Sequence, residues 1–424
     1  MGDRHLNRRA FIKGAAVLGT GVWLGIGRGF ASGKSANDKL NIGIIGVSNR
    51  AEANISGVKS QKVVALCDID EGYLRSAAED FPKANTYTDF RKLLEQPGID
   101  AVVISTADHT HAVATLMALD AGKHVYCEKP LTHTVHEARA VANAATQKKL
   151  ATQMGTQIHA SSNYRRVVEL IQSGAIGTVT EAHAFCNKSW GGGAVATEGQ
   201  AIPKHLHFDL WLGPAAARPY HSQYLPVNWR KWWDFGGGTL GDMGCHYLDL
   251  VHWALGLRRP KTIEAEGPPP NPETTPPWLI VNYQYDGVKV TWSDGGKKPR
   301  LITEGTVPSW KAGVLFVGAK GMLLADYTKH RLLPESQFAD FKAPARTIPD
   351  SIGHYEEWIE SCKTGSPTTC NFDYAGALSE TVLLGNVAYR AGHKIEWDAA
   401  NLRVTNDPAA MNFVSREYRK GWTV

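Results

Sequence analysis

Residues 41–68 are the feature that most constrains the fold of this chain. Residues 41–47 form an apolar run that contains glycine and is too short for a helix, so they predict a buried β-strand. Residues 63–67 form a second apolar strand, and Asp68 closes it 22 residues after Gly46. A strand, a turn, a helix start and an acid in this order are typical of a dinucleotide-binding βαβ unit. The sequence therefore predicts an α/β Rossmann domain with a bound nicotinamide cofactor.

The turn after the first strand departs from the Gly-x-Gly-x-x-Gly pattern of such units. Gly46 can make the tight turn, but Ser48 and Ala51 replace the second and third glycines. Alanine is accepted at the last position, and the Ser48 hydroxyl can donate to a phosphate oxygen. An ordinary βαβ crossover without a ligand is the alternative. We expect the pyrophosphate of the cofactor at the start of the following helix, in contact with Gly46, Ser48, Asn49 and Arg50.

Asp68 bears on the choice of cofactor. An acid at the end of the second strand can bond the ribose hydroxyls, and its charge would repel a 2′-phosphate. We therefore expect NAD, with NADP disfavoured.

The composition of the 424 residues limits the class of protein. A hydrophobic content of 43% and a charged content of 21% are globular values, and the length allows two domains. The net charge of +5 is mild and no stripe of Lys and Arg accompanies it, so we expect no nucleic-acid partner. The six cysteines are dispersed without Cys-x-x-Cys spacing, so we expect buried free thiols and no metal site. A bridge between Cys362 and Cys370 is the alternative.

The first segment resembles a targeting signal. Arg8 and Arg9 precede a weakly apolar, glycine-rich stretch at residues 14–27, in the manner of a twin-arginine export signal. We expect residues 1–38 to be signal and linker, the twin-arginine machinery to be a partner, and the protein to be periplasmic or otherwise exported. An uncleaved anchor and a coincidental arginine pair in a cytoplasmic protein are the alternatives. Export in the folded state would imply a cofactor that is bound in the cytoplasm and held tightly.

Polar residues follow the next strands of the predicted sheet at their carboxyl ends, where ligands bind in open parallel sheets. Thr106 and His109 follow the strand at residues 101–105, and we expect both to line the nicotinamide side. Glu128 and Lys129 follow the strand after it, and we expect both near the cofactor. Lys129 could hydrogen-bond the reacting hydroxyl and, with a depressed pKa, help to move its proton. A surface lysine beside a turn is the alternative.

The chain then crosses into a strand-rich region. Gln157 and His159 begin this crossover, and we expect the first to contact the cofactor and the second the substrate. Alternating stretches at residues 179–187, 279–285 and 288–292 predict strands of a mostly antiparallel sheet, with a hairpin at Asp286-Gly287 between the last two.

A glycine run leads into a second candidate catalytic segment. If residues 240–255 are helical, Asp242 and His246 are spaced i, i+4 and share one face. An alcohol that loses hydride must also lose a proton, so His246 suits a general base, and Asp242 can orient it or bind a sugar hydroxyl. A capping aspartate and a core histidine are the alternative. Trp190, Trp229, Trp232 and Trp233 could stack on sugar rings, and the alternative is that they belong to the core or to an interface.

Together these segments resemble the glucose–fructose oxidoreductase, inositol dehydrogenase and rhizopine-catabolism (Gfo/Idh/MocA) family. In that family the lysine of a Glu-Lys-Pro motif and an Asp-x-x-x-His after a glycine run are catalytic, which implies these roles for Lys129, Asp242 and His246. The family also implies a large, mostly antiparallel open sheet in the second domain, dimers or tetramers, and no metal. The motifs that carry the resemblance lie within residues 41–252: the strand and loop at Gly46, the strand end at Asp68, residues 106–111 and, above all, Cys127-Glu128-Lys129-Pro130.

These observations lead to one prediction with two alternatives. We expect residues 39–156 to bind the dinucleotide and residues 157–424 to form an α+β domain for substrate binding and oligomerisation. The predicted function is an exported NAD-dependent oxidoreductase that acts on a CH–OH group of a sugar, sugar derivative or cyclic polyol. The alternatives are an NAD-dependent glycoside hydrolase that oxidises its substrate transiently, and a sugar sensor without turnover. The substrate-binding residues would be Lys129, His159, Trp233, Asp242 and His246.

Overall fold

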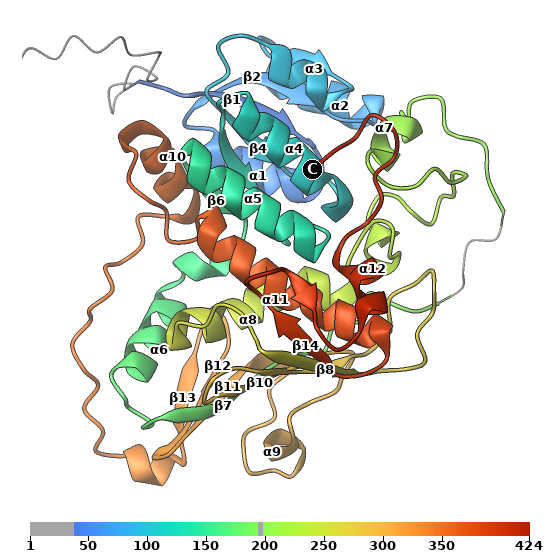
Figure 1. The fold of residues 1–424 in the computed structure, drawn as a ribbon. Coiled ribbons are helices and arrows are strands. Elements are labelled where there is room, and N and C mark those ends of the chain that lie inside the picture. Colours follow the sequence, from blue (N-terminus) through green and yellow to red (C-terminus); the bar gives the residue numbers. More distant parts are fainter. Residues whose placement is uncertain (1–37, 194–197) are drawn as a thin grey trace, which may run out of the picture.

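The computed structural model describes residues 38–193 and 198–424 of the chain. The predicted export signal lies outside the described residues. Two sheets form the body of the molecule, a six-stranded sheet in one half and a nine-stranded sheet in the other, with long helices between them (Figure 1).

The first sheet is parallel throughout, in the order β3-β2-β1-β4-β5-β6. Its central strands are buried on both faces, which is why they appear in the sequence as continuous apolar runs. The strand order reverses between β1 and β4, and this switch point places a ligand crevice at their carboxyl ends. The strands are β1 (Asn41–Ile45), β2 (Lys62–Cys67), β3 (Asn85–Tyr87), β4 (Ala101–Ile104), β5 (His124–Cys127) and β6 (Thr152–Met154).

Five helices connect these strands in the alternating pattern of a doubly wound fold. They are α1 (Arg50–Val58), α2 (Glu71–Asp80), α3 (Phe90–Glu95), α4 (Asp108–Asp120) and α5 (Val135–Lys148).

The second sheet has the order β13-β12-β11-β7-β10-β9-β8-β14-β15 and is antiparallel except where β7 pairs with β10. The predicted hairpin around Asp286-Gly287 joins β9 to β10. The prediction of a Rossmann sheet followed by a large, mostly antiparallel sheet is therefore confirmed. The strands are β7 (Val179–Cys186), β8 (Thr262–Glu266), β9 (Ile280–Gln284), β10 (Lys289–Ser293), β11 (Ala312–Gly318), β12 (Gly321–Ala325), β13 (His330–Leu333), β14 (Ile395–Asp398) and β15 (Arg403–Val404).

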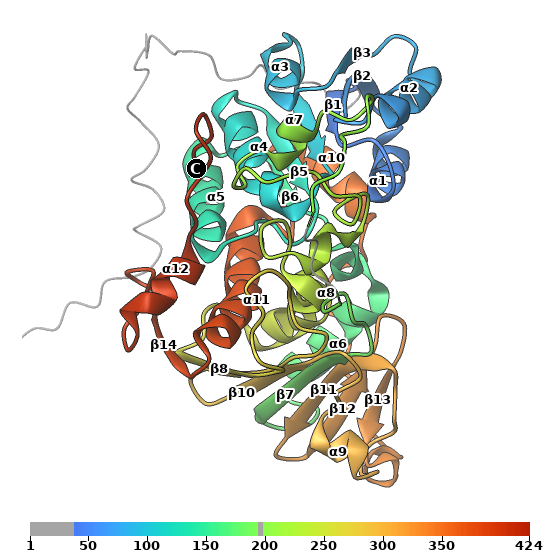
Figure 2. The ribbon, with the colours of Figure 1, turned by 90° about the vertical axis from the view of Figure 1, so that its right-hand side faces the viewer.

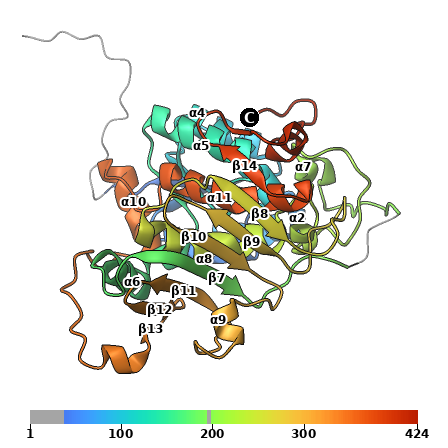
Figure 3. The ribbon, with the colours of Figure 1, turned by 60° about the horizontal axis from the view of Figure 1, so that its bottom comes forward.

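Helices α8 (Gly238–Leu255) and α11 (Phe372–Ala391) lie between the two sheets, beside α6 (Ser162–Gln172) (Figure 2). Helix α11 packs closely on α5, because a Cβ added at Gly376 would lie 2.8 Å from the Cβ of Ala142. The nine-stranded sheet packs its inner face against these helices, and Phe185, Leu315 and Leu324 of its outer face belong to a smaller buried cluster with Ile302 and Val307. Figure 3 shows the outer face, with α8 and α11 behind it.

The remaining elements are short apart from α10 (His354–Thr364), which packs against α1. The Tyr355 hydroxyl of α10 donates to Asn54 Oδ1 at 2.7 Å, and its ring fills the space that a side chain at Gly57 would need. The others are α7 (Phe208–Leu212), α9 (Arg300–Thr303), α12 (Met411–Val414) and the 3₁₀ helices Gln157–Ala160, Asn228–Lys231, Glu335–Phe338 and Pro408–Ala410.

Two findings concern the class of protein. All six cysteines are free, and five are buried, so the predicted free thiols are confirmed and Cys362 is not bridged to Cys370. Within residues 38–193 and 198–424, none of the helices combines the length and the apolar character that a membrane crossing requires.

Candidate active site

Gly46 makes the turn at the end of β1 in a conformation that favours glycine. Its φ is +85°, and a Cβ at this position would lie 2.8 Å from the carbonyl oxygen of Ser105. Its N–H donates to the carbonyl of Cys67 at 2.8 Å, which ties the turn to the end of β2. The chain therefore passes close to the switch point without a side chain in the way.

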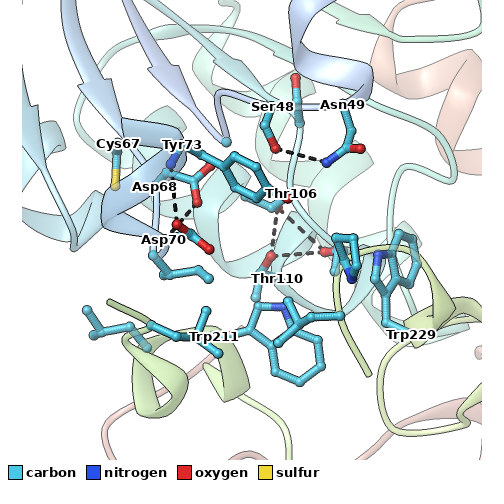
Figure 4. Close-up of a pocket in the computed structure, with 18 of the residues that line it drawn as sticks. Ser48, Asn49, Cys67, Asp68, Asp70, Tyr73, Thr106, Thr110, Trp211 and Trp229 are labelled. Carbon is cyan, nitrogen blue, oxygen red and sulfur yellow. Dashed lines mark hydrogen bonds between the residues drawn. The ribbon is translucent and has the colours of Figure 1, made fainter. Parts of the chain in front are cut away.

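The start of helix α1 faces this turn. Asn49 is the N-cap, and it forms a capping box with Glu52. The Asn49 amide also donates to Ser48 Oγ at 2.9 Å, so the two side chains lie together at the positive end of the helix. Helix α1 begins at Arg50, and this terminus opens onto a cavity (Figure 4).

Asp68 lies at the end of β2 and points into the same cavity. Its carboxylate accepts the N–H of Val47 at 2.9 Å and the N–H of Asp70 at 3.0 Å. Burial raises the pKa of Asp68, while these backbone hydrogen bonds oppose the rise. Each carboxylate oxygen has further lone pairs that can accept from ribose hydroxyls.

The cavity has a volume of about 380 Å³, within the range of ligand-binding cavities. We call it the groove. One wall consists of residues at the carboxyl ends of β1, β2 and β4, and the opposite wall carries Trp211 and Trp229 (Figure 4). The predicted cofactor residues that line it are Gly46, Ser48, Asn49, Arg50, Asp68, Thr106 and His109.

The opposite wall belongs to residues 198–231, which we call the strap. Its backbone is bonded to the segment that follows Asp68: the Glu71 N–H donates to His205 O at 3.0 Å, and the His207 N–H donates to Ile69 O at 2.8 Å. Asp70 and Leu206 form an isolated antiparallel bridge between these two bonds. The strap therefore covers the side of the groove where Asp68 lies.

Thr106 and His109 connect the sheet edge to the strap. The Thr110 hydroxyl donates to Thr106 Oγ1 at 2.7 Å, and His109 Nε2 lies 2.8 Å from the carbonyl oxygen of Trp211. Burial lowers the pKa of His109 to about 3, so the ring is neutral and can donate from Nε2. His109 thus lines the groove and also fixes the opposite wall through its hydrogen bond to Trp211.

Glu128 and Gln157, both predicted to contact the cofactor, do not line the groove and instead surround Arg50, which does. Arg50 Nε lies 2.9 Å from Glu128 Oε1, and Asn54 also donates to that oxygen at 3.0 Å. The side-chain amide nitrogen of Gln157 donates to Gly155 O at 2.8 Å, and its amide oxygen accepts from Arg50 Nη2 at 3.3 Å. These residues therefore position a guanidinium at the pyrophosphate side of the groove.

Lys129 and Asp242 form the centre of a second cluster. Lys129 Nζ lies 2.7 Å from Asp242 Oδ1 and also donates to the Asp242 carbonyl at 3.0 Å. Arg230 Nε donates to the same Oδ1 at 3.0 Å, and Trp190 Nε1 donates to Oδ2 at 2.8 Å. We call these four residues the charged centre. Asp242 was expected to orient or charge-stabilise His246 or to bind a sugar hydroxyl, and in the structure its carboxylate accepts from a lysine, an arginine and a tryptophan.

The ion pair in the charged centre changes the expected protonation of Lys129. Burial would lower the pKa of Lys129, but attraction to Asp242 and Glu128 outweighs it and raises that pKa. Burial would raise the pKa of Asp242, but attraction to the charges of Lys129 and Arg230 outweighs burial and holds that pKa well below its usual range. The expectation of a depressed lysine pKa is therefore wrong for the resting site. Lys129 is a fixed cation.

His246 lies one turn after Asp242 on α8 and is buried. Burial and the nearby Lys129 charge lower its pKa to about 3, so the imidazole is neutral. Its Nδ1 is buried and has no hydrogen-bond partner among residues 38–193 and 198–424. A neutral ring with an unused nitrogen can accept a proton from a ligand in this space.

His159 occupies a more structural setting. Its Nδ1 lies 2.9 Å from Asp249 Oδ1, and its ring stacks on Trp253 with centroids 4.0 Å apart. The Tyr374 hydroxyl donates to the same aspartate oxygen at 2.7 Å. His159 Nε2 has no partner within the described part of the chain, so this atom alone is available to a substrate.

Trp233, predicted to bind substrate, does not line the groove. Its indole donates to the carbonyl of Asn271 at 3.0 Å, and the Arg390 guanidinium lies 5.0 Å from its ring centroid. The ring is buried at the edge of the main core. The 3₁₀ helix Asn228–Lys231 turns the chain between Trp229 and Trp233, so the first faces the groove and the second does not.

Sequence reasoning missed Arg230 and Asp108, and it considered Trp190 only as a surface for sugar stacking and not as a donor to Asp242. Arg230 and Trp190 hold Asp242, and neither has a local motif that marks it. Asp108 is the buried first residue of α4 and accepts the N–H of Gly237. Burial raises the pKa of Asp108 to about 8, so its carboxyl is protonated at neutral pH. In the described residues no group of three or more His, Cys, Asp or Glu side chains is arranged to hold a metal ion.

The groove fits a dinucleotide on structural grounds. The turn at Gly46 leaves no side chain in the path, a helix N-terminus and Arg50 face one end, and the oxygens of Asp68 face the other. Arg230 joins the groove to the charged centre, because its side chain lines the former and bonds Asp242 in the latter.

Two family models match the chain. Residues 40–156 match "Oxidoreductase family, NAD-binding Rossmann fold", and residues 161–424 match "Oxidoreductase family, C-terminal alpha/beta domain".

Curated relatives match parts of the chain. A levoglucosan dehydrogenase of Pseudarthrobacter phenanthrenivorans is 25% identical over 231 residues, which are 51% of this chain and 51% of the relative. A 1,5-anhydro-D-fructose reductase of Ensifer adhaerens is 26% identical over 50% of this chain and 56% of its own length. An inositol 2-dehydrogenase of Salmonella typhimurium is 32% identical over 34% of this chain and 43% of its own length. The chain thus spans about half the length of these relatives.

Solved structures share the fold. GenD2 from gentamicin A biosynthesis, in complex with NAD, has a TM-score of 0.61 at 19% identity and covers 87% of this chain and 99% of its own. The WlbA dehydrogenase from Bordetella pertussis, in complex with NADH and UDP-GlcNAcA, has a TM-score of 0.61 at 17% identity. The match covers 85% of this chain and 99% of the WlbA chain. At these identities the likeness concerns the fold alone.

Proposed function

The chain belongs to the Gfo/Idh/MocA oxidoreductase family, and from this premise we propose that it is an exported NAD-dependent enzyme that oxidises or reduces a sugar, a sugar derivative or a cyclic polyol. The observation that carries the proposal is the position of Arg230. It lines the groove and also bonds Asp242, so a cofactor in the groove and a substrate at the charged centre would lie side by side.

The residues of this chain would divide the work as follows. NAD, when bound, supplies a carbon that accepts or returns hydride. The Lys129 ammonium holds the reacting oxygen and stabilises negative charge that develops on it. Asp242 fixes the ammonium, because its carboxylate is ionised and bonded to it at 2.7 Å. As an alcohol is oxidised, its hydroxyl proton passes to His246 Nδ1, which is neutral and unpartnered in the described structure.

The low pKa of His246 shapes this proposal. A histidine with a pKa of about 3 is a weak base until the charge near it changes. An alkoxide that forms against Lys129 would offset the lysine charge that lowers the pKa of His246, so the base becomes stronger as the reaction proceeds. Asp108, with a pKa of about 8, lies near the same charges and would take part in the pH dependence.

The wider organisation of the protein is also part of the proposal. Residues 1–38 would direct the folded chain through the twin-arginine route and residues 39–156 would hold the cofactor. Residues 157–424 would bind substrate and associate with further copies into a dimer or tetramer. The outer face of the nine-stranded sheet, which Figure 3 shows, is the surface we assign to that association.

A second candidate is an NAD-dependent glycoside hydrolase, and the strap favours it. The strap is bonded to residues 69–71 by main-chain atoms, so it would restrict release of a dinucleotide whose ribose lies at Asp68. A retained cofactor suits a cycle that takes hydride from a glycoside and returns it after the glycosidic bond has broken, because no external electron acceptor is needed.

One experiment separates these functions. A chain that begins at Ser32, without the predicted signal, would be mixed with sugars, cyclic polyols and aryl glycosides while reduced nicotinamide and released aglycone are followed by absorbance. Lasting nicotinamide reduction without cleavage identifies the oxidoreductase. Cleavage without net reduction identifies the hydrolase, and bound NAD with neither change would contradict both and leave a sensor.

A further inference from the structure

Trp190 is a large apolar side chain that is exposed beside the charged centre. Its relative exposure is 38%, although its indole N–H is used for a 2.8 Å hydrogen bond to Asp242 Oδ2. Tryptophan is largely buried in most proteins, so an exposed indole that reaches a buried carboxylate needs an explanation. The polar edge of the ring is already bonded and Lys188 Nζ lies 5.5 Å from the ring centroid over one face, so the apolar surface left for a ligand is the other face.

The loop that carries Trp190 is fixed rather than loosely attached. The Trp190 N–H donates to Thr239 Oγ1 at 2.8 Å, and the Gly192 N–H donates to Thr275 O at 2.8 Å. A Cβ added at Gly191 would lie 2.0 Å from Pro276 O, so the backbone there lies directly against its neighbour. The indole is therefore held in place before any ligand arrives, which lowers the entropic cost of binding on it.

The chemistry beside the ring indicates the class of ligand. An apolar aromatic face next to an ammonium and a carboxylate matches a molecule with an apolar face and a polar rim. A pyranose has this form, because its axial C–H bonds make one face apolar while its hydroxyls point outward from the ring. Aromatic side chains with one apolar and one wet side are suited to such ligands.

We propose that Trp190 is a specificity residue with two separable tasks. Its N–H positions Asp242, and its exposed face seats a pyranose ring, so the substrate is a cyclic sugar or its glycoside and not an acyclic polyol. This inference rests on the proposed function, and it narrows the substrate class at the same site.

Two variants separate the tasks. Trp190→Phe keeps an aromatic face and removes the N–H, whereas Trp190→Ala removes both. Trp310→Phe and Trp310→Ala are matched controls, since Trp310 precedes β11, has its ring centroid 4.5 Å from Lys329 Nζ and does not line the groove. Steady-state kinetics would use glucose, methyl glucopyranosides and methyl galactopyranosides, with glucitol and galactitol as acyclic counterparts.

The expected result is a split between KM and kcat. Trp190→Ala should raise KM for the pyranose compounds roughly 10- to 100-fold, since it loses both stacking and apolar burial. KM for any alditol that reacts should change less than about twofold, because no ring is seated. Trp190→Phe should have a KM for the pyranose compounds close to that of the wild type, because the aromatic face is kept. Its kcat should be lower than that of the wild type, because Asp242 has lost a donor. The Trp310 variants should match the wild type.

Several outcomes would overturn the inference. A wild-type preference for alditols, or an unchanged pyranose KM in Trp190→Ala while turnover continues, contradicts the inference and leaves the proposed function standing. A change of oligomeric state in Trp190→Ala with unaltered kinetics would identify the exposed face as a contact between copies. Absence of turnover both with these compounds and with the sugars, cyclic polyols and aryl glycosides of the first experiment contradicts the proposed function and the inference together.

Discussion

The groove and the charged centre are adjacent, yet they are built in different ways. The cofactor-facing wall of the groove depends on short segments at the ends of neighbouring strands, and its key side chains bond the backbone, as Asp68 does with Val47 and Asp70. The charged centre joins Lys129, Trp190, Arg230 and Asp242, which come from distant segments and bond one another through side chains. A site made by strand ends follows from local sequence, whereas a site made by long-range ion pairs requires the tertiary structure.

The largest expected effect tests the charged centre. Lys129→Met should lower kcat by roughly 10³-fold, because it removes the cation that holds the reacting oxygen and stabilises its charge. NAD content, measured after denaturation, should stay at the wild-type level, since Lys129 does not line the groove. Lys92→Met is the matched control, because Lys92 is exposed and pairs only with the exposed Glu95 among described residues.

Gly46→Ala tests whether the groove binds NAD. The new methyl group would meet Ser105 O at 2.8 Å in a backbone conformation with φ of +85°, at a cost of about 1–3 kcal/mol. We expect NAD binding, measured by calorimetry on stripped protein, to weaken by at least roughly tenfold. Gly98→Ala controls for the backbone conformation alone, since Gly98 has φ of +79° and open space around it. Equal NAD affinities in Gly46→Ala and Gly98→Ala would show that the turn at Gly46 does not contribute to NAD binding.

Arg230→Lys tests the link between the two regions. A lysine keeps the charge but has only one nitrogen, so it cannot both line the groove and bond Asp242 as the guanidinium does. We expect roughly tenfold losses in both kcat and NAD affinity. A loss confined to one of the two parameters would show that the regions act independently.

The smallest effect concerns acid stability in both regions. His109 and His246 have pKa values lowered to about 3 by burial, below the usual 6.5, so the unfolded chain binds protons that the folded chain does not. Their contribution to stability is complete above pH 6.5 and is lost as the pH falls toward 3, with an upper limit of about 1.4 kcal/mol per pH unit for each histidine. Urea unfolding of His109→Gln and His246→Gln between pH 7 and 5 should show weaker pH dependence than the wild type. His393→Gln should show no such weakening, because His393 is exposed and its pKa is raised by Lys394 O and Asp407.

The sequence allowed the fold to be predicted because its strands leave strong local signals. The runs that became β1, β2 and β4 are apolar and end at ligand-facing residues, and the Asp286-Gly287 hairpin has an ordinary turn composition. Lys129 and Asp242 could be named for a different reason, since each lies in a short motif that resembles a catalytic motif of the family.

The partners of those residues could not be read in the same way. Asp242 was assigned to His246 because helical spacing was the only geometry available, and the ion pair with Lys129 spans 113 positions in the chain. Trp233 was chosen from a cluster of similar residues, and only the tertiary structure shows that Trp229 lines the groove whereas Trp233 bonds the carbonyl of Asn271. The raised pKa of Lys129 depends on that same long-range pair.

The central claim is that a dinucleotide in the groove serves chemistry at the charged centre, and one comparison tests it most directly. Wild-type protein and Lys129→Met would be denatured, and any released dinucleotide would be identified by mass and quantified against protein. We predict near-stoichiometric NAD in both, with sugar-dependent nicotinamide reduction in the wild type alone. Absence of a dinucleotide from both proteins, together with no binding of added NAD, would contradict the account.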